Sequence, residues 1–274
     1  MNYSVAAGAL ISTDNLRHAA EDFRLGSRKT EWEKPDVSAF VDATFQGFHR
    51  SDGKVGTANH WLVIPLVFCE NRKVLTLKTA LEDKLGYQVE AKDYSDEVDE
   101  LILRYQSGAS VEELMAVDLS SAKENKRKHR LFPNVDGVKF LSHDMGCGGT
   151  RMDAEALCGL LAGYITHPNV AGATILSLGC QHAQASILHE EIAKRSPQFD
   201  KPLYVFEQQF EGTEQELMQK AIKATFAGLS VANTLTRQAA PLSKLCIGLE
   251  CGGSDGFSGI SANPALGYVS DMLV

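Results

Sequence analysis

The sequence predicts an α/β fold with a three-layer, mostly parallel, doubly wound sheet. Short apolar segments with the length of strands recur along the chain, and the segments between them have helical length and periodicity. Parallel neighbours need such long connections, because the chain must return to the start of the next strand. Four of the expected strands also run directly into a cysteine, so four thiols are expected at one edge of the sheet.

The strands expected to share this sheet lie near residues 61–68, 138–143, 173–179, 203–209 and 244–250. The cysteines that follow four of them are Cys69, Cys147, Cys180 and Cys251. Open α/β sheets bind their ligands outside the carboxyl ends of the strands. The sequence therefore predicts the active site at this edge before any family is considered.

Helices are expected where apolar periodicity ends at a glycine or begins at a capping box. Residues 72–85 precede Gly86, and residues 96–106 precede Gly108. Ser110 and Thr213 each stand three residues before a glutamate, as in a capping box. Further helices are expected over 183–194 and near Asn263.

Composition excludes two classes of partner. The 274 residues carry a formal net charge of −8, and no apolar run is long enough to span a bilayer. Nucleic-acid and membrane-surface binders need a basic face, so neither kind of partner is expected, and the chain is predicted to be cytoplasmic. Disulfides are then not expected. Cys158, in a helix, and Cys246, in a strand, are interpreted as small core side chains.

A glycine-rich segment follows the last expected strand. It contains Cys251, Gly252, Gly253 and Ser254 and leads into the helix expected near Asn263. Glycines let backbone N–H groups turn inward, and a helix N-terminus favours an anion. The spacing fits neither a phosphate-binding Walker loop nor a dinucleotide-binding motif, so a carboxylate is the favoured ligand. The alternative is a tight structural turn.

His143 and Cys147 are the next candidates, since imidazole and thiolate are ligands for soft or borderline divalent ions. Adjacent strands are about 4.8 Å apart, whereas thiolates on one zinc ion must lie within about 4 Å of one another. Cysteines that follow four separate strands are therefore not expected to bind one tetrahedral ion together. An iron–sulfur cluster spans more space and suits three cysteines, with one iron left open. A nucleophilic Cys147 or Cys180, with His143 or His182 as base, also stays open.

Several motifs together resemble the altronate and galactarate dehydratase family. They cover residues 50–59 (RSDGKVGTAN), 143–147 (HDMGC), 167–181 and 248–267, and the similarity runs from Phe45 to the C-terminus. The family usually has Arg where Ala58 stands and Glu where Gln181 stands.

The resemblance implies a hydro-lyase that removes water from a hexonate such as altronate to give a 2-keto-3-deoxy sugar acid. Galactarate or a related acid is the alternative substrate. Iron(II) or manganese(II) is the implied activator, with an iron–sulfur cluster as the other possibility. Metal ligands are expected among His143, Cys147, Cys180 and Cys251.

Elimination of water needs a base for the α-proton, a group that stabilises the enediolate, and an acid for the leaving hydroxyl. His143 and Cys147 are the expected catalytic residues, although His143 cannot be both base and metal ligand. Arg50 can pair with a carboxylate through two hydrogen bonds. The residues expected to bind the substrate are Arg50, Asn59, Gly252, Gly253, Ser254 and Asn263.

The resemblance also predicts the domain organisation. Residues 1–40 are expected to be the remnant of a small N-terminal β-domain with a connector, and residues 41–274 the α/β dehydratase core. Family members extend beyond both ends of this chain, so the isolated chain is expected to have little activity, and a missing C-terminal segment or a homo-oligomer is expected to cover an apolar surface. A non-catalytic sugar-acid-binding fragment that needs a partner segment is the alternative function.

Overall fold

The computed structural model describes residues 33–87, 95–119, 129–250, 252–253 and 255–274. The chain falls into two compact units. One comprises residues 43–247, and the other comprises the described parts of residues 1–42 together with 248–274. The expected β-domain remnant at residues 1–40 lies almost entirely outside the described residues and stays a prediction.

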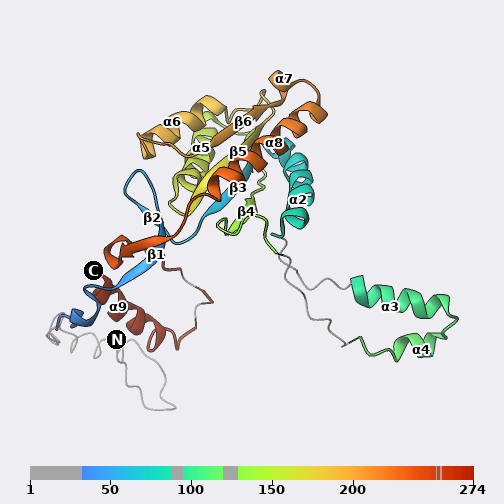
Figure 1. The fold of residues 1–274 in the computed structure, drawn as a ribbon, viewed down its shortest axis with the longest axis horizontal. Coiled ribbons are helices and arrows are strands. Elements are labelled where there is room, and N and C mark those ends of the chain that lie inside the picture. The colour runs from blue at the N-terminus through green and yellow to red at the C-terminus, as the bar shows by residue number, and fades with distance from the viewer. Residues whose placement is uncertain (1–32, 88–94, 120–128, 251, 254) are drawn as a thin grey trace, which may run out of the picture. The chain divides into compact units, whose positions relative to one another are not determined.

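A four-stranded parallel sheet forms the centre of the 43–247 unit (Figure 1). Its strands, in spatial order, are β4 (Gly137–Phe140), β3 (His60–Pro65), β5 (Val170–Ser177) and β6 (Leu203–Glu207). The chain passes from β3 to β4 on one side and then crosses to β5 on the other side. The carboxyl ends of β3 and β5 therefore flank a topological switch point, where doubly wound sheets bind ligands.

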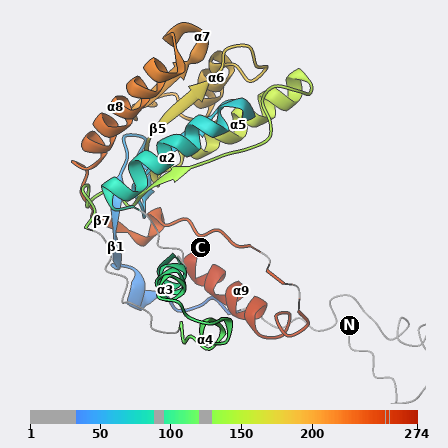
Figure 2. The ribbon, with the colours of Figure 1, turned by 90° about the vertical axis from the view of Figure 1, so that its right-hand side faces the viewer.

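Helices cover both faces of this sheet, so the predicted three-layer fold is confirmed (Figure 1, Figure 2). Strand β3 shows why: Trp61 and Val63 face one hydrophobic cluster, while Leu62 and Ile64 face the other. Successive side chains of a strand point to opposite faces, and a strand buried on both faces is apolar throughout. The first cluster contains residues of α2 (Asn71–Leu85) and α8 (Glu214–Ala232), and the second contains residues of α5 (Arg151–Thr166) and α6 (Ala185–Arg195).

The predicted helix ends are also found. Gly86 and Gly108 have φ of +76° and +89°, the left-handed conformation that suits glycine after a helix. The capping boxes at Ser110 and Thr213 form as expected. Ser110 opens α4 (Val111–Met115), and Thr213 opens α8. Among the described residues of this unit, the other α-helices are α3 (Ser95–Gln106) and the short α7 (Gln208–Glu211), and a 3₁₀ turn, η2 (Phe68–Glu70), follows β3.

A small antiparallel sheet, not expected from the sequence, pairs the segment before the parallel strands with the segment after them. It has the order β2 (Val55–Gly56), β1 (Thr44–His49), β7 (Gln238–Pro241). The buried ring of Phe48 anchors it, with the guanidinium carbon of Arg237 4.7 Å from the ring centroid. A glycine-rich segment therefore pairs with a strand almost 200 residues away, which local sequence patterns do not reveal.

The prediction of a strand at residues 244–250 is wrong. A short 3₁₀ turn, η3 (Leu242–Lys244), is followed by irregular backbone through residue 250. Strand β7, which immediately precedes this segment, pairs with β1 rather than with the parallel sheet. Cys246 is consequently exposed, which corrects its interpretation as a core residue, whereas Cys158 is buried in α5 as predicted.

The second unit contains a short 3₁₀ turn, η1 (Ser38–Phe40), and α9 (Ala262–Leu273), the helix expected near Asn263. No residue of α9 is buried. The exposed apolar side chains of this region include Phe257, Ile260, Leu266, Tyr268 and Val269. Across the described parts of both units, no helix has the length and apolar character needed to cross a membrane.

Candidate active site

Three loops meet at the carboxyl edge of the parallel sheet, at the switch point. They follow β3, β4 and β5, and they carry Cys69, Cys147 and Cys180 respectively. Cys69 and Cys180 are exposed, and Cys147 is half-buried. The prediction that these three cysteines share one edge is confirmed, because the three strands run parallel. Cys251 lies outside the described residues.

Gly146 joins the three loops. Its carbonyl accepts hydrogen bonds from the N–H groups of His182 (3.0 Å) and Ala183 (3.1 Å), which follow β5. It also lies so close to residues 66–67 that a Cβ would overlap the Leu66 carbonyl oxygen, and its φ of +103° is one that side chains rarely adopt. The preceding carbonyl, of Met145, accepts from the N–H of Phe68 at 3.0 Å. Only glycine fits this position.

His143 holds the same loop through its ring. The Nε2 atom lies 2.7 Å from the Pro65 carbonyl oxygen, and Nδ1 accepts from the Met145 N–H at 3.2 Å. Since Pro65 offers only an acceptor and Met145 only a donor, the ring is neutral with its hydrogen on Nε2. The side chain of Asn71 donates to the His143 carbonyl at 2.9 Å. In this arrangement neither ring nitrogen is free to take a proton or bind a metal, so His143 acts as a positioning residue.

A buried ion pair, not expected from the sequence, supports the loop after β3. Lys73 Nζ donates to both carboxylate oxygens of Glu70, at 2.7 and 2.8 Å, and both side chains are buried. Glu70 directly follows Cys69, and Lys73 lies in the first turn of α2. Removing one partner of such a pair leaves an uncompensated buried charge, so the pair fixes this loop against the helix.

Gln181 organises the loop after β5. Its Nε2 donates to Ser177 Oγ (2.6 Å) and to the Ala183 carbonyl (3.2 Å), while Oε1 accepts from the Gly179 N–H at 2.7 Å. The side chain is only 2% exposed. The family resemblance implies that a glutamate usually stands at this position. An ionised glutamate has no N–H to donate, so it could not make the two donor hydrogen bonds that Gln181 makes.

The two helices that begin at this edge, α5 and α6, differ in whether side chains cap the N–H groups of their first turn. The first turn of α5 is occupied by a capping box in which Thr150 and Asp153 satisfy one another's backbone N–H groups. By contrast, α6 has no side-chain cap at Gln184 and no acid in its first turn. Uncapped N–H groups at a helix start attract anions. The beginning of α6 is therefore the available anion-binding position beside Cys180.

A single metal ion does not fit the described residues. Nowhere in the described parts of the chain do three or more His, Cys, Asp or Glu side chains gather closely enough to hold one ion. Both nitrogens of His143 are engaged, and Cys251, another expected ligand, is not described. The iron(II) or manganese(II) implied by the family resemblance consequently stays a prediction.

Arg50 and Asn59 lie at the opposite, amino edge of the sheet. Arg50 Nε donates to the Pro168 carbonyl (2.7 Å), and Nη2 donates to Asn59 Oδ1 (3.0 Å). Asn59 is fully buried, and its Nδ2 donates to the carbonyls of Asn134 (2.9 Å) and Ala232 (3.0 Å). These hydrogen bonds tie the starts of β3, β4 and β5 together. The structure thus separates both residues from the cysteine edge, and their role in substrate binding stays a prediction.

Lys201 lies at this amino edge, beside Arg50, in a cavity of about 170 Å³. Its ammonium donates to the carbonyls of Ile165 (3.3 Å), Thr166 (3.2 Å) and His167 (2.7 Å), at the C-terminal end of α5. Burial, and then the nearby Arg50 charge, lower the pKa of Lys201 to about 7. The three carbonyls oppose this shift, because they stabilise the charged form.

In the 248–274 unit, the glycine-rich segment closes on itself. Asp255 Oδ1 accepts from the N–H groups of Phe257 (2.8 Å) and Ser258 (3.0 Å), and the Ser258 carbonyl accepts from the Asn263 N–H at 2.8 Å. A Cβ on Gly252 or Gly253 would meet open space, so packing does not require glycine there. Ser254 lies outside the described residues. The expected substrate-binding role of this segment stays a prediction.

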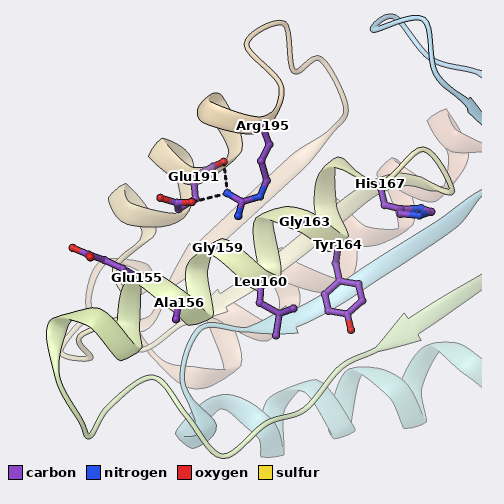
Figure 3. A pocket seen from close by; sticks show the side chains of 9 residues that line it. All are labelled: Glu155, Ala156, Gly159, Leu160, Gly163, Tyr164, His167, Glu191 and Arg195. Atoms are coloured by element: carbon purple, nitrogen blue, oxygen red, sulfur yellow. Dashed lines mark hydrogen bonds and ion pairs between the residues drawn. The ribbon is translucent and has the colours of Figure 1, made fainter. Parts of the chain in front are cut away.

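An open groove of about 700 Å³ is lined by residues of α5 and α6, together with His167 (Figure 3). Small residues Ala156, Gly159 and Gly163 line its floor, and the Glu191–Arg195 ion pair borders it. None of the residues expected to act in catalysis or binding lines this groove. The carboxyl edge therefore remains the candidate active site.

The fold and the site together define a doubly wound α/β protein whose polar loops and thiols gather at the switch point of the sheet. Residues 47–233 match the second domain of the D-galactarate dehydratase/altronate hydrolase family, and residues 242–274 match the C-terminal domain of D-galactarate/altronate dehydratases. The chain belongs to the galactarate/altronate dehydratase family.

Curated relatives agree with this assignment. Altronate dehydratases of Bacillus subtilis (strain 168) and Escherichia coli (strain K12) are 27% and 24% identical to the chain over 270 residues. Those matches cover 98% of this chain but 44% of each relative. Galactarate dehydratase (L-threo-forming) of Escherichia coli (strain K12) is 32% identical over 111 residues, which is 39% of this chain and 21% of that protein. The chain thus spans less than half the length of the relatives that it matches.

A Gly146→Ala substitution tests whether this residue joins the three loops. The new Cβ would overlap the Leu66 carbonyl at a φ that alanine rarely adopts. We expect the free energy of unfolding to fall by about 2–4 kcal/mol, and the thiols of Cys69 and Cys147 to react faster with a thiol reagent. Gly148→Ala is the matched control, because a Cβ there meets open space. Equal effects of the two substitutions would contradict the proposed role of Gly146.

The lowered pKa of Lys201 predicts that the free energy of unfolding depends on pH. The unfolded chain keeps the lysine proton up to about pH 10.4, whereas the folded chain loses it near the lowered pKa of about 7. The unfolded state then binds more protons between these pH values. The free energy of unfolding, relative to a Lys201→Met variant, therefore rises with pH from about 7, by up to about 1.4 kcal/mol per pH unit.

Denaturant titrations at several pH values measure this difference, with Lys223→Met, at an exposed lysine of α8, as the control. A difference between the wild type and Lys201→Met that stays constant up to about pH 10 would show that the three carbonyls keep Lys201 charged.

Proposed function

We propose that this chain carries part of the active site of a sugar-acid dehydratase, at the carboxyl edge of its parallel sheet. The observation that carries this proposal is the meeting of three loops at the switch point in a member of the galactarate/altronate dehydratase family. Such an edge is where doubly wound sheets bind small anionic ligands. The substrate is a hexonate such as altronate, which loses water by α,β-elimination to give a 2-keto-3-deoxy sugar acid.

Altronate is the first choice of substrate because similarity to altronate dehydratases covers nearly all of this chain. Similarity to galactarate dehydratase covers a smaller part of it. Both substrates carry a carboxylate next to a hydroxyl-bearing carbon. The uncapped start of α6 would receive that carboxylate, with backbone N–H groups and the positive end of the helix dipole favouring its charge.

Proton removal needs an imidazole or another base with a free lone pair. His143 has both nitrogens engaged, which suits it to holding the loop. His182 is exposed, and its backbone N–H is fixed by the Gly146 carbonyl. We therefore assign the base to His182 and a positioning role to His143. His143 fixes the geometry of the loop, and His182 then takes the proton from the substrate carbon that lies next to the bound carboxylate.

The predicted divalent metal would stabilise the enediolate when bound, although the described residues do not gather into a site for a single ion. The alternative function is sugar-acid binding without catalysis. Product formation distinguishes it from the first proposal.

A Ser186→Asp substitution tests the anion-binding position. Ser186 is exposed in the first turn of α6, so the new carboxylate occupies the same N–H groups as the substrate. We expect the helix to be stabilised slightly and altronate binding to weaken by roughly two- to fivefold, corresponding to about 0.3–1 kcal/mol. Ser186→Asn is the control of equal size without the charge.

Calorimetric titration with altronate, galactarate and succinate measures binding, and detection of 2-keto-3-deoxy acid measures turnover. Preference for the sugar acids over succinate supports a sugar-acid site, and turnover that falls in His182→Gln supports catalysis. Absence of binding to either sugar acid by the wild type, or equal binding by the wild type and Ser186→Asp, would contradict the proposed site.

A further inference from the structure

We propose that the groove along α5 is a surface through which two copies of this chain associate. In this pairing, α5 of one copy crosses α5 of the other in the antiparallel sense, about a two-fold axis. The groove belongs to the 43–247 unit, and none of its lining residues is assigned to the candidate active site. The proposal therefore does not depend on the dehydratase activity.

The first observation concerns two glycines in the floor of the groove. Gly159 and Gly163 lie inside α5, and neither has a positive φ. A Cβ on Gly163 would meet nothing within 4 Å, and one on Gly159 would meet only the ends of the Arg195 and Glu191 side chains. Glycine inside a helix costs about 0.5–1 kcal/mol relative to alanine. Contacts within the chain therefore do not require these glycines, whereas close packing of a second helix on this face does.

The second observation is an apolar ridge beside the glycines. Leu160 and Tyr164 are 57% and 49% exposed and stand one turn apart on α5. Figure 3 shows both side chains on the side of the helix away from Glu191 and Arg195, with the glycine row between. Rows of residues four apart form the ridges and grooves that pack against another helix. One face of α5 thus carries a ridge and a groove of the same spacing.

A two-fold axis makes this face complementary to itself. With the axis at the level of Leu161, antiparallel crossing places Gly159 of one copy opposite Gly163 of the partner subunit. The ridge of Leu160 and Tyr164 from each copy then enters the glycine groove of the other. A different protein would have to supply both a matching ridge and a matching groove, whereas a second copy already carries them.

The polar groups at the two ends of the groove favour the same arrangement. Glu155 lies at the N-terminal end and His167 at the C-terminal end, about 18 Å apart along the helix at 1.5 Å per residue. His167 Nδ1 accepts from the Asn169 N–H at 3.1 Å, so the hydrogen of the neutral ring is on Nε2. Within the described part of the chain, this Nε2 has no hydrogen-bond acceptor.

Antiparallel pairing brings the Nε2–H group of His167 to the Glu155 carboxylate of the partner subunit, at both ends of the interface. Glu155 accepts one hydrogen bond from Arg151 Nε at 2.9 Å, and a carboxylate can accept several. Parallel pairing would instead place the two Glu155 carboxylates side by side, where they repel. The charges therefore select the antiparallel arrangement.

The expected association is weak and reversible, because the interface consists mainly of one helix pair. Stable complexes commonly bury about 1,200–2,000 Å² in total, and smaller interfaces are typical of transient ones. We therefore expect a dimer with a dissociation constant on the order of 10–100 µM.

Sedimentation velocity of the full chain, from about 1 to 300 µM, measures this equilibrium. Gly163→Leu fills the groove but adds its side chain to open space in the single chain. It should raise the dissociation constant at least tenfold without lowering the unfolding temperature. Ala227→Leu is the matched control, because Ala227 is exposed on α8, outside the groove.

A charge exchange tests whether the partner is a second copy. Glu155→Lys removes the acceptor, and His167→Glu introduces a repelling carboxylate while keeping an acceptor for the Asn169 N–H. Each change alone should weaken the dimer by roughly two- to fivefold, the size of an exposed ion pair. The double variant should recover the affinity of the wild type, because the new lysine of each copy meets the new glutamate of the other.

A chain that stays monomeric up to about 300 µM would overturn the proposal. A dimer that Gly163→Leu and Ala227→Leu weaken equally, or that neither weakens, would also overturn it. Association that survives Gly163→Leu but is lost in Tyr268→Asp would place the interface on the exposed face of α9 and contradict the assignment to α5.

Discussion

The backbone contact at Gly146 is the constraint on which the site depends. A positive φ and the absence of a Cβ let this residue lie against the Leu66 carbonyl while its own carbonyl receives two N–H groups from the loop after β5. One residue thus connects loops from three neighbouring strands. Each thiol-bearing loop is short and is fixed on at least one side by this junction, so the cysteines cannot be placed independently of it.

Most of the polar groups around the junction already have partners within the protein. The ring of His143 bridges Pro65 and Met145, and Thr150 and Asp153 cap α5. Satisfied groups of this kind position a site rather than bind its ligand. Among the described residues of this edge, the start of α6, the exposed His182 and the thiols of Cys69, Cys147 and Cys180 are available to a ligand. This division explains why His143, a catalytic candidate in the sequence, positions the loop instead.

The parallel sheet and its carboxyl edge were predictable because they follow from local signals. Apolar runs, helical periodicity and the capping boxes at Ser110 and Thr213 each involve residues close in sequence, and the family motifs added the functional class. The rest depends on contacts between distant residues. The pairing of β1 with β7 spans almost 200 residues, and the 244–250 segment that follows β7 forms no strand. Likewise, the motif containing Arg50 and Asn59 gave no indication that both residues tie the amino edge.

Proximity of the three edge thiols is the central claim, and chemical cross-linking measures it most directly. The folded chain is treated with a short reagent that bridges two thiols, and the linked peptides are identified by mass spectrometry. The structure predicts bridges that join Cys147 to Cys69 and to Cys180, and none that involve the buried Cys158. Single-site labelling of all three edge cysteines without any bridge between them would contradict the convergence of the loops, and with it the account of the site.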